Sequence, residues 1–221
     1  MQYTKLGNSE LSVSRICLGC MGFGDAGNGQ HSWTIDEEHS REIIKRALEL
    51  GVNFFDTAIG YQSGTSEQYV GRAVRDFAKR EDVVVATKFL PRSGDEIAAG
   101  ITGQQHIERM LNTSLSNLGL NYVDLYVYHM WDYQTPLYEI MDGLNNAVKA
   151  YRHFQLLRVA ACQGQRPGGK GRLRQICIHP GPLQPDIPGG RSGDGKALYR
   201  GQHCHDAIQC IGGWTALQAP W

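Results

Sequence analysis

Short apolar runs alternate with longer amphipathic stretches along residues 1–150. Two short runs around a turn at Gly7 predict an N-terminal hairpin. The later apolar runs predict strands at 16–19, 52–57, 83–88 and 123–129. Stretches with a helical period predict helices at 36–50, 66–78, 104–118 and 137–150. Because strands alternate with helices and the strand runs are apolar throughout, the pattern favours a parallel sheet with both faces covered.

Turn and cap residues define the predicted ends of these helices. Gly51 and Gly119 are expected to stop the first and third helices, and Ser66 is expected to cap the start of the second. The segment between the third strand and the third helix holds Gly and Pro, so it is expected to be a loop. Residues 16–150 therefore make four strand–helix units.

Three of the predicted strands end in a titratable residue. The strand at 52–57 carries Asp56, the next ends at Lys88 and the fourth at His129, while Tyr61 follows Asp56 in the stretch Asp-Thr-Ala-Ile-Gly-Tyr. Each residue alone is more simply explained as a strand end or a turn. Their occurrence on successive strands, however, is typical of a (β/α) barrel, whose active site is built at the carboxyl ends of its strands.

These four side chains would form a general acid if they met. A tyrosine hydroxyl has an ordinary pKa of ~10, and a neighbouring lysine ammonium favours the phenolate. A carboxylate beside the lysine would hold it in place and keep it charged, and a histidine would orient the reacting oxygen. We therefore expect Asp56, Tyr61, Lys88 and His129 to be catalytic residues that protonate an oxygen while hydride arrives at carbon.

Residues 1–150 resemble the aldo-keto reductases, of the branch related to bacterial oxidoreductases and potassium-channel β subunits. The resembling segments are Lys5-Leu6-Gly7, Leu18-Gly19-Cys20-Met21, Gly51 to Ala58 with Tyr61, Ala86-Thr87-Lys88 and Tyr122 to His129. The resemblance implies an α/β fold of the TIM (β/α)8 barrel type, truncated to about four recognisable β/α units after an N-terminal hairpin. It also implies bound NADPH and reduction of a small-molecule carbonyl substrate, an aldehyde or ketone, to an alcohol.

The resemblance also implies a role for each site residue. Tyr61 would donate the proton, Lys88 would assist its ionisation and Asp56 would hold Lys88. His129 would orient the carbonyl. The loop after the first strand would approach the nicotinamide, which points to Cys20 and Met21 as cofactor-binding residues. Asp56 is expected to be a third. No metal is expected.

The composition changes after Ala150. Residues 151–221 hold 12 of the 27 Gly, six of the eight Pro, nine Lys and Arg, and three Asp, with no Glu. The family's fifth strand, with its Ser-Asn pair for the nicotinamide, does not follow. We therefore expect two parts: the N-terminal half of a reductase barrel at 1–150, and a non-homologous, poorly ordered tail at 151–221.

A change of reading frame near residue 151 would explain this tail. With permitted codons read one base later, residues 154–161 can give Ser-Asn-Cys-Tyr-Ala-Trp-Gln. The ranges 175–185, 201–208 and 210–218 can likewise give strings that resemble the family's later strands, in order. Coding DNA in which the offset frame lacks these strings would contradict the hypothesis.

Two other functions stay open. Four barrel units would leave two sheet edges unpaired, so the chain is expected to self-associate, or to be a catalytically inactive fragment unable to bind cofactor. Gly22, Gly24 and Gly27 match the G-x-G-x-x-G pattern of a Rossmann-type dinucleotide-binding module. The sequence continues as a loop to Thr34 instead of opening a helix at Gly27, so a loop at the barrel rim is the favoured interpretation.

Cysteine, histidine and aromatic motifs give weaker signals. Cys17 and Cys20 have C-x-x-C spacing, but no second pair follows, and two ordinary thiols are the favoured interpretation. A His-Cys-His run at 203–205 and a caspase-like Ala-Cys-Gln-Gly at 161–164 lie in the tail and are interpreted as coincidences. Three aromatic residues follow the first and fourth strands and fit pocket walls and loop anchors equally well: Trp33, Trp131 and Tyr133.

The bulk composition narrows the protein's expected surroundings. The 221 residues have zero formal net charge, and no apolar run approaches the ~18 residues needed to cross a bilayer. The first residues have no apolar signal segment, and without one the six cysteines are expected to be free thiols. The basic tail lacks interleaved aromatic residues. We therefore expect a cytoplasmic protein with neither a nucleic-acid nor a membrane partner.

Overall fold

The computed structural model describes residues 1–7, 9–130, 134–150, 156–159 and 176–178. Its strands are β1 (Tyr3–Lys5), β2 (Ser12–Ser14), β3 (Leu18–Gly19), β4 (Phe54–Asp56), β5 (Val84–Phe89), β6 (Leu125–Tyr128), β7 (Leu156–Val159) and β8 (Ile176–Ile178). Its α-helices are α1 (Glu37–Glu49), α2 (Thr65–Phe77), α3 (Gly94–Ala98), α4 (Gly103–Leu118) and α5 (Leu137–Ala150). Two short 3-10 helices, η1 (Tyr61–Gly64) and η2 (Arg80–Asp82), precede α2 and β5.

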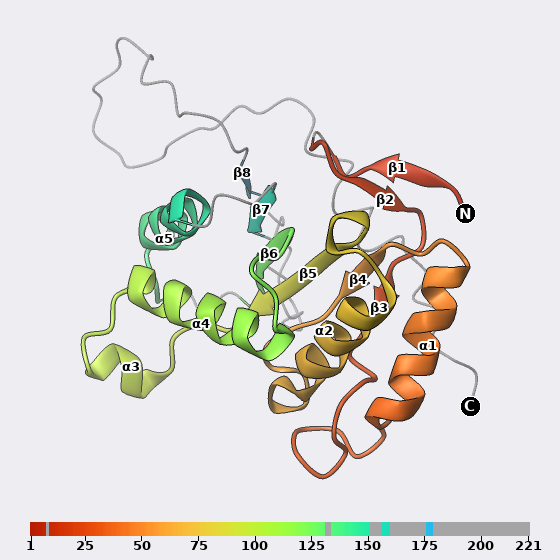
Figure 1. Cartoon of the computed structure of the whole chain (residues 1–221). Coiled ribbons are helices and arrows are strands. Elements are labelled where there is room, and N and C mark those ends of the chain that lie inside the picture. The colour runs from red at the N-terminus through yellow and green to blue at the C-terminus, as the bar shows by residue number, and fades with distance from the viewer. Residues whose placement is uncertain (8, 131–133, 151–155, 160–175, 179–221) are drawn as a thin grey trace, which may run out of the picture.

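Six strands form one sheet in the order β3-β4-β5-β6-β7-β8, so each strand after β3 lies beside its predecessor in the chain. Pairing is parallel from β3 to β7 and antiparallel between β7 and β8. In Figure 1 the helices α1, α2, α4 and α5 follow one another along the sheet, and the β1–β2 hairpin lies at one end. This sequential order is that of a (β/α) barrel. The described strands contain no reversal of order of the kind at which Rossmann folds bind nucleotides.

Caps and turns set the ends of the helices. The Asp36 carboxylate caps α1 by accepting a backbone N–H, and Thr102 and Gln105 form a capping box at the start of α4. Gly51 and Gly119 follow α1 and α4 with φ of +84° and +62°, a left-handed conformation that favours glycine. The predicted stops at both glycines are confirmed.

Two local predictions were wrong. Ser66 does not cap α2, because Gly64 takes that position and Ser66 lies buried within the helix. The segment after β5 is not only a loop, since it contains α3. A capping box of Ser93 and Glu96 starts this helix, and that local pair outweighs the Gly and Pro around it.

The strands β7 and β8 lie in the range expected to be a poorly ordered tail. β7 pairs in parallel with β6, with Leu156 opposite Leu125, and β8 runs antiparallel to β7. Both strands are short and mainly apolar, β7 containing one Arg, and they lie within a sequence rich in Gly and Pro. The composition of the whole tail therefore gave no sign of them. The described sheet thus extends beyond the four predicted β/α units.

The sheet separates two groups of buried apolar side chains. The group between sheet and helices includes Ile44, Phe55, Val74, Val85 and Leu111. The group on the opposite face includes Leu6, Leu11, Val13, Phe54, Val84 and Leu125. Side chains alternate between faces along a strand, which explains why the strand runs are apolar throughout. Phe54, Val84 and Leu125 each begin a strand, so the hairpin residues cover the amino ends of the strands.

A buried ion pair links the amino ends of β5 and β6. Arg80 Nη2 donates to Asp124 Oδ2 at 2.6 Å, and the same oxygen accepts the Val85 amide at 2.9 Å. The guanidinium also lies 3.9 Å from the ring centre of Tyr122. Burial raises the pKa of Asp124 above its ordinary value, and the Arg80 charge limits this rise. The pair therefore stabilises the end of the sheet remote from the predicted site.

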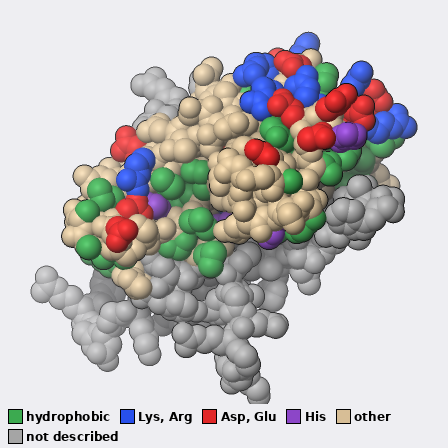
Figure 2. All heavy atoms as spheres, turned by 90° about the horizontal axis from the view of Figure 1, so that it is seen from below, with side chains coloured by type: hydrophobic (Ala, Val, Ile, Leu, Met, Phe, Trp, Pro, Cys, Tyr) green, Lys and Arg blue, Asp and Glu red, His purple; other side chains and the backbone are tan. Residues whose placement is uncertain are grey.

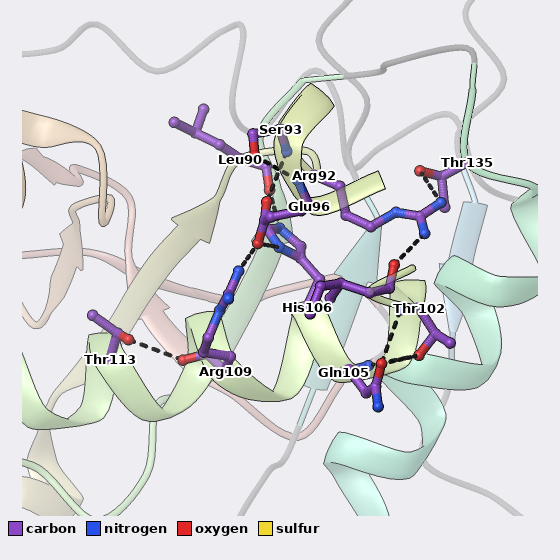
Figure 3. A network of polar contacts seen from close by, with 11 residues as sticks. Leu90, Arg92, Ser93, Glu96, Thr102, Gln105, His106, Arg109, Thr113 and Thr135 are labelled. Carbon is purple, nitrogen blue, oxygen red and sulfur yellow. Dashed lines mark hydrogen bonds and ion pairs between the residues drawn. The ribbon is translucent and has the colours of Figure 1, made fainter. Parts of the chain in front are cut away.

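A polar network fixes the segment that follows β5 (Figure 3). The buried His106 ring contacts Glu96 Oε1 at 3.0 Å through Nδ1 and the Leu90 carbonyl at 2.7 Å through Nε2. Arg109 of α4 pairs with the same Glu96 carboxylate. These contacts join α3 and α4 to the residue directly after β5, and so hold the carboxyl end of the strand that carries Lys88.

Charges on the outer helices are mixed in sign. Arg41 pairs with Asp76, and Arg72 with Glu37, between α1 and α2. Figure 2 shows acidic and basic side chains interleaved at one end of the face in view. Nucleic-acid sites gather basic groups on one face, whereas these charges on α1 and α2 are paired with opposite charges.

Candidate active site

The parallel register brings the predicted site residues to one end of the sheet. Asp56 is the last residue of β4, Lys88 is the last but one of β5, and His129 directly follows β6. Backbone pairing continues just past the strands, because the Ile59 amide donates to the Lys88 carbonyl at 3.0 Å and the His129 amide to the Phe89 carbonyl at 2.9 Å. The three side chains therefore lie at the carboxyl ends of hydrogen-bonded parallel strands, on a rigid backbone.

The Lys88 ammonium lies at the centre of the site. Its Nζ donates to Asp56 Oδ2 at 2.8 Å, to the Thr57 carbonyl at 2.8 Å and to the Tyr61 hydroxyl at 3.2 Å. Burial lowers the pKa of Lys88, but its electrostatic interactions and hydrogen bonds with Asp56 and Tyr61 outweigh burial, so this pKa lies above its ordinary value. Lys88 is therefore a charged donor whose position is fixed by three acceptors.

Tyr61 and His129 complete the group. Their rings meet edge to face with centroids 5.8 Å apart. Burial, and then repulsion from the Lys88 ammonium, lower the pKa of His129 below its ordinary value, so the imidazole is neutral at neutral pH. Its Nδ1 is buried and has no hydrogen-bond partner among the residues that the structure describes. Such a nitrogen is suited to bind a polar atom of a ligand.

The residues expected at the nicotinamide lie in different surroundings. Met21 is exposed just after β3, and the Asp56 side chain is 32% exposed. Cys20 is fully buried: its thiol donates to the Leu18 carbonyl at 3.3 Å, and its carbonyl accepts from Ser66 at 2.7 Å. The structure therefore leaves Met21 and Asp56 open to a ligand and gives Cys20 a role in packing.

The C-x-x-C pair consists of two ordinary thiols, as the sequence favoured. Cys17 directly precedes β3, instead of lying within a strand as expected, and Cys20 directly follows it. Burial raises the pKa of both thiols, and the Asp56 carboxylate adds to this effect, so both stay protonated and unreactive. No cluster of His, Cys, Asp and Glu fit to hold a metal ion occurs in the described part of the chain. The motifs at 161–164 and 203–205 lie outside that part.

Ser66, in the first turn of α2, contacts the residues that directly follow β3 and β4. Its Oγ donates to the Cys20 carbonyl and lies 3.0 Å from the Thr57 hydroxyl. Thr57 directly follows Asp56 and its carbonyl binds Lys88. Ser66 therefore supports the backbone that orients the ammonium. Sequence reasoning missed this role, because a serine at a helix start also fits an ordinary cap.

Glu67, the next residue, is completely buried against β5. Its carboxylate accepts from Thr87 Oγ1 at 2.5 Å and from Asn117 Nδ2 at 2.8 Å. Thr87 directly precedes Lys88, so this contact joins α2 and α4 to the strand that carries the ammonium. An acidic residue in a first helical turn is common, and nothing in the sequence distinguishes this one as buried.

Glu67→Gln is expected to remove a pH dependence of stability. Burial raises the pKa of Glu67, and the hydrogen bonds from Thr87 and Asn117 offset only part of that effect. A carboxyl whose pKa is raised on folding favours the folded state fully below its ordinary value of 4.5, and loses that contribution as the pH rises through the folded-state pKa. Urea unfolding should therefore show E67Q gaining free energy of unfolding relative to wild type between about pH 4 and about pH 8. The exposed Glu38→Gln is the control, and an equal difference at both pH values would refute the expectation.

The loop between β3 and α1 carries Trp33. Its side chain is exposed and its ring stacks on His31 with centroids 4.8 Å apart. The predicted loop is confirmed, since Gly27 opens no helix and α1 begins only at Glu37. Trp131 and Tyr133 lie outside the described residues, so of the three aromatic candidates for a pocket wall only Trp33 is placed.

Comparison with known proteins decides the family. The family model described as Aldo/keto reductase family matches residues 15–154. The chain belongs to the aldo/keto reductase family. The matched range contains all four residues of the site, Asp56, Tyr61, Lys88 and His129. The predicted fold class agrees with membership of this family.

Curated relatives in this family are about one third identical to this chain. Norsolorinic acid reductase B from Dothistroma septosporum is 34% identical over 67% of this chain and 39% of its own length. Aryl-alcohol dehydrogenase from Phanerodontia chrysosporium, whose name specifies NADP(+), is 33% identical over 62% and 38%. A putative voltage-gated potassium channel subunit beta from Schizosaccharomyces pombe is 34% identical over 67% and 42%. The chain thus spans less than half the length of these relatives.

Solved structures agree in fold. A thermostable aldo-keto reductase in complex with the inhibitor epalrestat superposes with a TM-score of 0.60 at 28% identity, over 72% of this chain and 53% of that one. An aldo-keto reductase from Bacillus halodurans in its holo form gives 0.59 at 29% identity, over 73% and 50%. The described residues therefore form part of a TIM barrel, which is the predicted fold class.

Proposed function

We propose that this aldo/keto reductase chain carries the site for NADPH-linked reduction of an aldehyde or ketone to an alcohol, with Tyr61 as proton donor. The observation that carries the proposal is the Lys88 ammonium, 3.2 Å from the Tyr61 hydroxyl and 2.8 Å from the Asp56 carboxylate. A cation held against a phenol favours loss of the phenolic proton while a neighbouring oxygen gains one. The names of two relatives, a reductase and an aryl-alcohol dehydrogenase, support this reaction class.

Each residue has one task in this mechanism. Tyr61 passes its hydroxyl proton to the carbonyl oxygen, and the Lys88 ammonium stabilises the phenolate that remains. Asp56 and the Thr57 carbonyl hold Lys88 Nζ in place. The neutral His129 imidazole, whose pKa is lowered, donates a hydrogen bond to the same carbonyl oxygen and orients it.

The described residues fit the reactive end of NADPH. Met21 and Asp56 are open to a ligand beside the site, and the buried His129 Nδ1 lacks a partner in the described part of the chain. When bound, NADPH supplies the hydride, and Tyr61 supplies the proton that the reduced oxygen then needs. The choice of NADPH rests on the relative whose name specifies NADP(+).

Two measurements on the purified chain test this proposal. Titration with NADPH, followed by nucleotide fluorescence, should show saturable binding. Mixing with an aromatic aldehyde should then oxidise NADPH and form one alcohol per NADPH. Lys88→Met should abolish turnover, and the exposed Lys79→Met should not. Binding without turnover would refute catalysis, whereas no binding would support the alternative of a catalytically inactive fragment.

We propose a small-molecule carbonyl compound as the partner of this chain. We propose that it binds neither nucleic acid nor a membrane. Among the described strands, β3 pairs only with β4 and β8 only with β7. Unpaired strand edges bind further strands, so we propose self-association through these edges, which a single monomeric species in sedimentation velocity would refute. Within the described ranges we find no helix with the length and apolar character of a membrane span.

A further inference from the structure

The turn directly after Tyr61 has an uncommon backbone. Gln62 and Ser63 have φ of +47° and +53°, and Gly64 follows with φ of +87°. Gln62 and Ser63 are the two non-glycine residues with positive φ in the part of the chain that the structure describes. A residue with a Cβ keeps this conformation only where its surroundings hold it there.

The Gln62 side chain supplies such surroundings. It is 1% exposed, and its Nε2 donates to the Asp25 carbonyl and to the His31 carbonyl, each at 2.8 Å. Its Oε1 accepts the His31 amide at 2.9 Å. Both amide hydrogens and the amide oxygen are therefore used, and all three bonds go to the loop between β3 and α1.

Two glycines of that loop make room for Gln62. A Cβ placed on Gly24 would lie 2.6 Å from Gln62 Cβ, and one placed on Gly29 would lie 2.6 Å from Gln62 Cα. Thr65 adds a second link, because its hydroxyl donates to the Gln62 carbonyl at 2.7 Å and accepts the Asp25 amide at 3.0 Å. The glycines therefore allow the loop to pack directly against Gln62, where a side chain at either position would clash.

We propose that Gln62 is the positioning residue for Tyr61. By fastening the loop of residues 24–31 to the left-handed turn, it fixes the backbone that holds the Tyr61 hydroxyl 3.2 Å from Lys88 Nζ. It also holds the backbone of His31, on whose ring Trp33 stacks. This inference rests on the proposed function only in giving Tyr61 a catalytic task, since the geometry of the turn stands without it.

Two substitutions separate the hydrogen bonds from the backbone conformation. Gln62→Asn keeps an amide and a residue type that tolerates left-handed φ, but its side chain is one methylene shorter and is not expected to keep all three hydrogen bonds to the loop. Ser63→Gly relaxes the neighbouring left-handed residue and leaves all three bonds of Gln62 in place, and Ser63 itself is exposed. Ser63→Gly is therefore the matched control.

The first readout needs no catalysis. In protein labelled with 3-fluorotyrosine, the Tyr61 fluorine resonance is assigned by its loss in Tyr61→Phe. Its chemical shift should change on Lys88→Met, because the ammonium lies beside the ring. If Gln62 positions Tyr61, that change should fall by about half or more in a Gln62→Asn background and persist in Ser63→Gly. An equal change in all three backgrounds would overturn the proposal.

The second readout is turnover. Gln62→Asn should lower kcat on the order of 10-fold to 100-fold while the KM for NADPH stays within about twofold, because a small displacement of a reacting group slows the chemical step. Ser63→Gly should keep the wild-type kcat. Unchanged kcat in an active Gln62→Asn protein would overturn the proposal. If the wild-type chain shows no turnover, the proposed function fails, and the fluorine measurement alone decides the role of Gln62.

Discussion

Tyr61→Phe is expected to lower kcat for NADPH-linked carbonyl reduction by about 10²-fold to 10⁴-fold, the usual contribution of a general acid. The substitution removes one oxygen, which accepts a hydrogen bond from Lys88 Nζ at 3.2 Å and is the proposed proton donor. The ring remains, and with it the edge-to-face contact with His129. The loss should therefore fall on kcat, with NADPH binding kept, as measured by nucleotide fluorescence and NADPH oxidation on one preparation.

A second tyrosine provides the control for this substitution. Tyr138 on α5 is 66% exposed, so Tyr138→Phe should leave both binding and turnover at wild-type values. Wild-type kcat in Tyr61→Phe would exclude Tyr61 as proton donor, whatever the activity of the other variants. Loss of NADPH binding together with kcat would indicate damage to the site instead, which near-ultraviolet circular dichroism would detect.

Arg80→Met is expected to destabilise the fold by about 3–5 kcal/mol, the usual cost of removing one partner of a buried ion pair. The Asp124 side chain is 7% exposed and would lose its 2.6 Å contact with the guanidinium. Its charge would then lie unpaired beside the Val85 amide. The free energy of unfolding from urea titration measures this effect, and it requires no catalytic activity.

The loss of unfolding free energy in Arg80→Met should depend on pH in a defined direction. Burial already raises the pKa of Asp124, so without Arg80 the carboxyl should prefer its neutral form still more. The deficit of Arg80→Met relative to wild type should therefore shrink as the pH falls from about 8 toward about 4. Arg41→Met, which breaks the more exposed pair with Asp76, is the control and should cost at most about 1 kcal/mol. Similar losses in the two variants would contradict a special role for the buried pair.

The three site residues at strand ends could be predicted because each follows an apolar run in the sequence. Asp56, Lys88 and His129 close apolar runs that predict strands, and parallel strands bring their carboxyl ends together. Tyr61 is different, because it lies in η1, beyond β4 and before two left-handed residues that no propensity predicts. Its place in the site was expected from the chemistry of a tyrosine beside a lysine and then from the family resemblance, and the structure now supplies its contact with Lys88.

The supporting residues could not be predicted because their partners are remote in the chain. Gln62 binds an amide 31 residues away, and Glu67 binds Asn117 across 50 residues. The sequence of a helix's first turn does not distinguish a buried glutamate from an exposed one, because burial depends on the position of the neighbouring helix. The short helix α3 was missed for the opposite reason: its capping pair, Ser93 and Glu96, was readable locally, but the surrounding glycines and proline received more weight.

Because each strand from β4 to β8 pairs with the strand that precedes it in the chain, we expect the sheet to assemble in chain order. During synthesis, each of these described strands would emerge after the earlier strand with which it pairs. It therefore closes a loop no longer than one β/α unit, and the entropy lost at each addition stays small. We therefore expect the Lys88–Asp56 contact to form once β5 pairs with β4, before the later strands are added.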